Sequence, residues 1–362
     1  MTLLHIESWE GYDRDTVLLN GGKYENWTSE GANDIVISNS YGRNSSTGLR
    51  LRTSSTTVGQ RAHITRHLSG NYDTIIVGAA IHLDNLGDFG LETAQTAHRR
   101  TIFALMDGDT VQVALSVTPS MRLQVTQGEG ISTIARSTFY LHAGIYYYIE
   151  FKCLVSNTAG AFDVRVDGIS RLTGSGDTQV TGLQYINGVR FGAKSTVVNT
   201  GRFIRFDDMY IANIESNTYN DFVGDVRVEG LRPTGDRPTH QWDPSSGTLH
   251  YITVDDLTPD TTDYITSGVI GNIDLFSFPS PSTPAGSILA ITPNIYARKT
   301  NAGVGRVAAV VNQAGSTEVG QDNYLTQEYR YHYNDIWIKN PIDNLQWPST
   351  LSNIYFGVKK SG

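Results

Sequence analysis

The sequence predicts an all-β protein made of two tandem antiparallel β-sandwiches. Short runs of alternating apolar and polar residues recur along the 362-residue chain, as in half-buried strands. Clusters of Gly, Asn, Asp and Ser separate many of these runs, and 36 glycines suit the many turns of such a fold. No segment carries a sustained helical apolar stripe. We therefore expect a concanavalin A-like first sandwich over residues 1–215, a linker over 216–221 and a jelly-roll-like second sandwich over 222–362.

In the first module the expected strands are short runs rich in β-branched or aromatic residues. In chain order they cover Gly48–Ser54, Arg61–Leu68, Thr74–Leu83, Thr101–Met106, Val111–Val117, Met121–Val125 and Ile145–Val155.

The clearest element is a hairpin over Ile145–Gly168. Its first strand has one apolar phase, and the turn Ser156–Gly160 connects it to a returning strand with a second apolar phase. A register slip by one residue would expose the whole set, so the pattern fixes which side faces the core. The residues expected inside are Tyr147, Ile149, Phe151, Cys153, Val155, Phe162, Val164 and Val166.

The join between the modules begins with the strand pattern of Arg202–Asn213. We expect Phe203, Phe206, Met209 and Ile211 on its buried face, and two aspartates interrupt it without a nearby basic residue. Alternation resumes at Phe222–Val228, which predicts the opening of the second module. Further strands of that module are expected at Ile288–Lys299 and Gly305–Asn312.

These segments support a family resemblance. The run Ile145–Asn213 resembles the laminin-G-like and concanavalin A-like sandwiches of tailed-bacteriophage structural proteins, and that resemblance extends over about residues 1–215. The segments Phe222–Asp236 and His240–Gly268 resemble the β-module that often follows these lectin-like domains. Together the two resemblances imply a virion protein.

Charge and composition exclude some classes of binding partner. The net charge is −8 and no Lys/Arg run occurs, so we expect no nucleic-acid binding. No apolar run reaches the ~18 residues of a membrane span, so we expect no membrane insertion. The single cysteine, Cys153, excludes an intrachain disulfide framework and is expected to be a buried core residue. The first residues lack the pattern of a signal peptide, which favours folding in a cytoplasm.

Two acidic stretches are candidate sites, and both are interpreted as structural. Asp207 and Asp208 offer oxygen ligands for calcium, but consecutive residues of a strand point to opposite faces. The stretch Val254–Asp263 does not have the spacing of a calcium-binding loop and is typical of turns.

A catalytic site is not expected. Retaining glycosidases need two carboxylates about 5–5.5 Å apart, and the nearest candidates, Asp225 and Glu229, are separated by Arg227 on the same expected strand face. His63 and His67 lie ~13 Å apart if extended, too far to share a zinc ion. We therefore predict that the chain is not an enzyme and assign no catalytic, cofactor-binding or metal-binding residue and no cofactor.

The resulting hypothesis is a bacteriophage virion structural protein, an accessory tail, collar or capsid-surface component assembled in the bacterial cytoplasm. Its partners would be other virion proteins and further copies of itself, with a trimer as the specific hypothesis. The alternative is a receptor-binding module that contacts host-surface glycans through exposed aromatic rings. An open aromatic-lined groove would favour the alternative. The tryptophans considered were Trp9, Trp27, Trp242, Trp337 and Trp347.

Overall fold

The computed structural model describes residues 2–12, 23–28, 35–53, 61–83, 100–194, 202–215, 220–256, 258–282, 286–333 and 335–362. The chain divides into two compact units. Unit 1 contains residues 1–9 and 24–228, and unit 2 contains residues 10–23 and 229–362. Residues 216–219 of the expected linker lie outside the described residues, and the described residues 10–12 and 23 belong to unit 2.

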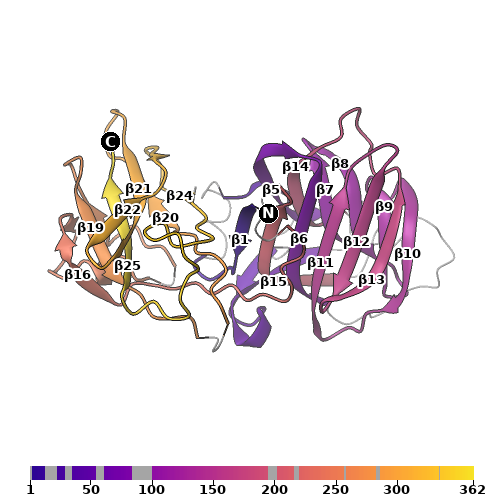
Figure 1. Ribbon diagram of the computed structural model, residues 1–362, viewed down its shortest axis with the longest axis horizontal. Coiled ribbons are helices and arrows are strands. Elements are labelled where there is room, and N and C mark those ends of the chain that lie inside the picture. The colour runs from indigo at the N-terminus through magenta and orange to yellow at the C-terminus, as the bar shows by residue number, and fades with distance from the viewer. Residues whose placement is uncertain are drawn as a thin grey trace. The chain divides into compact units, whose positions relative to one another are not determined.

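Unit 1 is a sandwich of two antiparallel sheets (Figure 1). Sheet A has eight strands among the described residues, in the order β13-β12-β11-β6-β15-β4-β3, with β1 also paired to β15. Its strands are β1 (Leu3–Glu7), β3 (Ile35–Ser38), β4 (Gly48–Thr53), β6 (Thr74–Leu83), β11 (Tyr146–Leu154), β12 (Gly160–Val166), β13 (Ile169–Gly176) and β15 (Arg202–Asn213).

Sheet B forms the second layer, with seven strands among the described residues in the order β10-β9-β8-β7-β14-β5-β2. Its strands are β2 (Glu25–Thr28), β5 (Arg61–Tyr72), β7 (Arg100–Asp107), β8 (Thr110–Val117), β9 (Arg122–Gln127), β10 (Ser132–Tyr140) and β14 (Ile186–Lys194). A short 3-10 helix, η1 (Arg43–Ser45), precedes β4.

The two sheets meet through apolar side chains on their facing sides. Phe206 of sheet A packs against Phe103 and Phe191 of sheet B, with ring centroids 6.4 and 5.9 Å apart. The predicted inward phase of the β11–β12 hairpin is confirmed, since all eight residues expected inside are buried. Cys153 is among them, and burial raises the pKa of its thiol. Each fully buried large apolar side chain stabilises such a core by roughly 1.5–3 kcal/mol.

One expectation for β15 is corrected. Phe203 was expected in the core, but Ile204 and Phe206 occupy the inward positions of this part of the strand. Phe203 therefore points outward and is half-buried, with the Arg50 guanidinium 4.5 Å from its ring centroid.

Unit 2 has one larger antiparallel sheet, in the order β16-β19-β25-β21-β22 with β23 paired to β21. Its strands are β16 (Gly235–His240), β19 (Ile273–Ser277), β21 (Arg306–Gln313), β22 (Ser316–Val319), β23 (Asn323–Tyr324) and β25 (Ile354–Lys360). Two small ribbons add β17 (Asp243–Pro244) with β18 (Ile265–Thr266) and β20 (Ile295–Ala297) with β24 (Arg330–His332), and a 3-10 helix, η2, covers Tyr251–Thr253. Trp347 and Phe356 are central to one of its apolar clusters.

The predicted all-β class is confirmed, but some expected strands are not formed. Phe222–Val228 does not form a strand, because the N–H groups of Gly224 and Val228 donate to side chains of sheet A instead of to a neighbouring strand. Within Ile288–Lys299, only Ile295–Ala297 forms a strand.

Candidate functional site

The outer face of sheet B carries a line of hydrogen-bonding side chains. Phe103, Phe191 and Leu115 face the core, so their neighbours on each strand face outward. A register shift after Thr101 turns its side chain outward as well, opposite Ser116. We use the name polar row for six residues of this outward face and its adjoining turn: Arg136, Gln124, Ser116, Thr101, Glu129 and Arg190. Five of them come from the adjacent strands β10, β9, β8, β7 and β14, and Glu129 lies between β9 and β10.

Hydrogen bonds connect members of the polar row across the sheet. An Arg190 guanidinium nitrogen lies 2.6 Å from Glu129 Oε1, and the Thr101 hydroxyl lies 3.5 Å from the same oxygen. The Ser116 hydroxyl is 3.5 Å from that of Thr101. At the β10 edge, Arg136 Nε donates to Gln124 Oε1 over 3.2 Å. These contacts hold the side chains in defined positions.

The accessible groups lie at the two ends of the row. At the β10 end, Tyr140 is 52 % exposed, and the guanidinium of Arg122 lies 5.2 Å from its ring centroid. Gln124, Ser116, Thr101 and Arg190 are buried, so they support the ends and are not themselves open to solvent.

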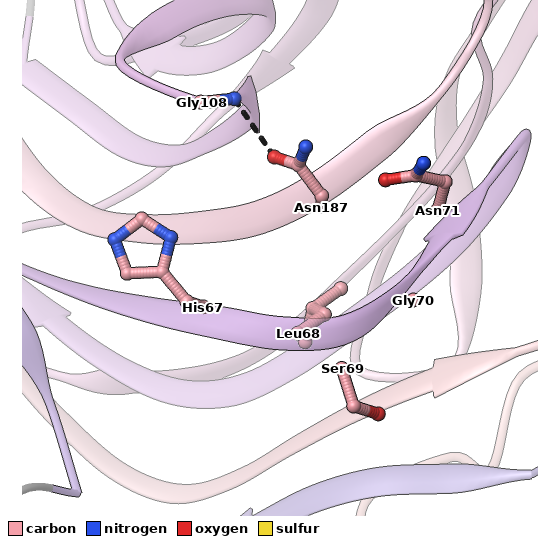
Figure 2. Close-up of a pocket in the computed structure, with 7 residues that line it drawn as sticks. All are labelled: His67, Leu68, Ser69, Gly70, Asn71, Gly108 and Asn187. Carbon is pink, nitrogen blue, oxygen red and sulfur yellow. Dashed lines mark hydrogen bonds between the residues drawn. The ribbon is translucent and has the colours of Figure 1, made fainter.

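At the other end is a shallow hollow of about 340 Å³ formed by β5, β14 and the β7–β8 turn. Figure 2 shows His67, Asn71 and Asn187 at this hollow, with the backbone N–H of Gly108 donating to Asn187 Oδ1 over 2.8 Å. His67 is two residues beyond Thr65, which is the register partner of Arg190. The hollow therefore continues the polar row along β5.

The two adjacent aspartates occupy a different place, and the argument from strand alternation was wrong there. A register shift separates Asp207 from Tyr210, and Asp208 has a φ of 51°. This bulge turns both carboxylates toward Arg43. Asp207 Oδ2 accepts the Arg43 backbone N–H over 2.8 Å, and Asp208 Oδ2 accepts Arg43 Nε over 2.9 Å. The basic partner is thus far away in the sequence.

Burial, together with the neighbouring Asp208 carboxyl, raises the pKa of Asp207 to about 7. Burial also raises the pKa of Asp208, against hydrogen bonding from Val228 and the charge of Arg43. In the described part of the chain, no group of three or more His, Cys, Asp or Glu side chains is arranged to hold a metal ion. The two aspartates join η1 and residues 225–228 to sheet A.

The other residues singled out in the sequence do not come together. Asp225 lies beside Arg43, whereas Glu229 belongs to unit 2 and accepts the N–H of Ser282. Within Val254–Asp263, Asp260 accepts the N–H of Thr262, as in a turn. His63 and His67 both lie on β5. No helix among the described residues has the length and apolarity to cross a membrane.

The tryptophans do not form an exposed platform in the part of the chain that the structure describes. Trp9 and Trp347 are buried, and Trp242 and Trp337 are half-buried against apolar clusters of unit 2. The side chain of Trp27 lies outside the described residues. Sequence reasoning missed the polar row, because its members are spread from residue 101 to residue 190 and only strand pairing aligns them.

No known protein-family model matches the chain, and no curated protein matches its sequence. Solved structures with similar folds include the cellulose-induced protein Cip1, with 14% identity, a TM-score of 0.41, and coverage of 56% of this chain and 94% of that chain. Another is the catalytic domain of a glycoside hydrolase family 131 protein from Coprinopsis cinerea, with 13% identity, a TM-score of 0.40, and coverage of 60% and 97%. The alginate lyase AlyC3 has 7% identity, a TM-score of 0.34, and coverage of 46% and 74%.

These comparisons correct one expectation. The prediction that the chain is not an enzyme is overturned, because catalytic proteins are among the similar structures. The scores are too low to transfer a reaction or a catalytic residue to this chain. The resemblance to bacteriophage virion proteins receives no support from these structures and stays a prediction.

Proposed function

We propose that unit 1 is a glycan-binding module that holds an oligosaccharide against the outer face of sheet B. The observation that carries this proposal is the position of the accessible groups at the two ends of the polar row, with the Tyr140 ring at one end and the side chains of His67 and Asn71 at the other. Sugar hydroxyls both donate and accept hydrogen bonds, and the exposed amide of Asn71 supplies both functions. A few well-placed polar groups are also what fixes ligand orientation in binding sites generally.

The positions of the accessible ends favour an oligosaccharide over a single sugar. Tyr140 lies on β10 and His67 on β5, and five strand spacings separate these strands. At about 4.8 Å per spacing, the ends are about 24 Å apart. Tyr140 offers an aromatic surface at one end, and Asn71 offers an amide at the other. A ligand that reaches both ends must have several sugar units.

The test is a glycan array with the full chain, followed by titration calorimetry with the longest oligosaccharide that binds. Asn71→Ala and Tyr140→Ala should each weaken binding about tenfold, which corresponds to about 1.4 kcal/mol. Asn157→Ala is the matched control, because Asn157 is also exposed but lies on the turn between β11 and β12. The proposal is wrong if no glycan binds, or if both variants bind the oligosaccharide as tightly as the control.

A further inference from the structure

Two histidines of unit 2 lie next to each other at the two ends of the loop 241–249. His240 is the last residue of β16, and His250 immediately precedes η2. Their ring centroids are 5.3 Å apart, and the ring planes meet at 74°. The proposed glycan-binding function uses neither residue, since it belongs to unit 1.

Hydrogen bonds fix the tautomer of both rings. Nδ1 of His250 lies 2.6 Å from Oδ2 of Asp274, and Nδ1 of His240 lies 2.8 Å from the carbonyl oxygen of Arg237. A carboxylate or carbonyl oxygen accepts hydrogen bonds, so each Nδ1 carries the proton and donates it. In the neutral ring the other nitrogen, Nε2, then presents a lone pair. Both histidines are therefore in the form that binds a metal ion through Nε2.

The carboxylate behind His250 is itself held in place. Asp274 is fully buried, and its Oδ1 accepts the backbone N–H groups of Gln241 over 2.5 Å and Trp242 over 2.8 Å. The backbone of His250 is fixed as well, because its N–H donates to Asp236 Oδ2 over 2.9 Å. In metal sites, a histidine ligand almost always donates its second ring N–H to a carboxylate, a backbone carbonyl or water, which orients the ring and raises its basicity. His250 and His240 show the carboxylate and the carbonyl version of this arrangement.

The separation of the rings fits a shared metal ion. Two imidazoles that bind one tetrahedral zinc ion through Nε2, with bonds of ~2.1 Å, have ring centres about 5 Å apart. The separation of 5.3 Å between His240 and His250 agrees with this value. Neither Nε2 atom makes a hydrogen bond to the residues that the structure describes. His240 is exposed and His250 is 6 % exposed, so an ion can approach from the side of His240.

We propose that His240 and His250 form a binding site for a divalent transition-metal ion of the zinc type. Imidazole nitrogen suits zinc, whereas calcium and magnesium require oxygen ligands. Two protein ligands are fewer than the three or four of most zinc sites, so water fills the other positions and the affinity is lower than in those sites. The bound ion would connect the two ends of the loop 241–249.

The first experiment measures zinc binding to the full chain by titration calorimetry. His240→Phe keeps an aromatic ring for the edge-to-face contact with His250 but removes the ligand nitrogen. His142→Phe is the matched control, because His142 is also exposed but lies between β10 and β11 in unit 1. We expect the wild type and the control to bind zinc alike, and His240→Phe to bind it at least tenfold more weakly. Equal zinc binding by the two variants overturns the inference and leaves ring packing as the reason for the contact.

Asp274→Asn tests the tautomer argument. The new amide oxygen would accept the N–H groups of Gln241 and Trp242, so its NH₂ group would face Nδ1 of His250. The ring would then carry its proton on Nε2, which removes the lone pair that binds the ion. Zinc binding should weaken roughly 10- to 100-fold, as for other partners that orient metal-binding histidines. Asp274 acts here as a positioning residue, and unchanged zinc affinity in a folded Asp274→Asn variant contradicts this step.

Thermal unfolding gives a second measurement that does not depend on heat of binding. Zinc should raise the unfolding temperature of unit 2 in the wild type and in His142→Phe, because it binds the folded state, and should not do so in His240→Phe. Calcium at the same concentration should leave all three unchanged. A rise with calcium equal to that with zinc, or no rise with zinc in the wild type, overturns the inference. Because the site lies in unit 2, either result of the glycan array leaves it standing.

Discussion

Asp208 has a left-handed backbone conformation, with a φ of 51°, and this changes the directions of the side chains around it. Because of this bulge, Asp207 and Asp208 share Arg43 as a partner instead of facing opposite sides of the sheet. Burial and the neighbouring Asp208 carboxyl raise the pKa of Asp207 to about 7, well above its ordinary value of 3.8.

This pKa makes the stability of unit 1 depend on pH. A folded-state pKa above the unfolded value stabilises the fold fully below about pH 4, and the contribution is lost as pH rises through about 7. Between pH 5 and pH 8 the loss should be on the order of 1–3 kcal/mol. Urea unfolding at the two pH values measures it.

The matching variant is Asp207→Asn, which should remove most of this pH dependence. Asp109→Asn, on the exposed β7–β8 turn, serves as the control and should leave it intact. Equal pH dependence in both variants would show that Asp207 is already ionised at pH 5.

Gly78 provides a second prediction at this scale. A Cβ atom at this position would lie 2.1 Å from a ring carbon of Tyr210, whose hydroxyl donates to the buried Glu150 carboxylate over 2.5 Å. Gly78→Ala should displace the ring and destabilise unit 1 by about 2–4 kcal/mol, through overpacking and loss of a buried hydrogen bond. Gly182→Ala, with no atom within 4 Å of the added carbon, is the control. Similar unfolding curves for the two variants would refute the packing argument.

Among the elements, the segment 222–228 depends on sheet A for its conformation. Gly224 N–H donates to Glu150 Oε1 over 2.8 Å, and Val228 N–H donates to Asp208 Oδ1 over 2.8 Å. Arg43 donates to the carbonyl of Val226 over 2.7 Å. Burial raises the pKa of Glu150, against its hydrogen bonds from Tyr210 and Gly224. Hydrogen bonds to side chains therefore hold this segment in place, as hydrogen bonds to a neighbouring strand would in a sheet.

Arg43→Lys should release this segment, because a lysine ammonium cannot bind Asp208, Asp225 and Val226 at once. Trypsin cleavage after Arg227 should become about tenfold faster, if the bonds contribute about 1.4 kcal/mol to holding the segment closed. The control is Arg171→Lys, on β13. Equal cleavage rates in two variants with unchanged circular dichroism would exclude this role for Arg43.

The whole molecule should unfold in two steps, because the chain forms two compact units. Trp347→Ala removes a buried ring from a core cluster of unit 2 and should cost about 3–5 kcal/mol there. In calorimetry it should lower one transition only, and Gly78→Ala should lower the other. A single transition lowered by both variants would mean that the units unfold together.

Much of the fold of unit 1 could be predicted from sequence, because alternation within one strand decides which side chains are buried. The hairpin of β11 and β12 follows its pattern throughout. The candidate sites could not be predicted, because they depend on which distant strands pair. The register of His240 with Asp274 and the bulge at Asp208 leave no local signal. In Phe222–Val228 the alternation is present, but side chains satisfy the backbone and no strand forms.

The pairing of β1 with β15 has a consequence for synthesis. Leu3 is the register partner of Ala212, so β1 is synthesised long before β15, the strand with which it pairs. Until β15 has been synthesised, β1 has no strand to pair with. Closing such a long loop is slow relative to forming local hairpins. During translation, the nascent chain therefore carries a strand whose backbone N–H and C=O groups have no partner strand. Such an exposed strand can pair with other chains, and chaperone binding would prevent this.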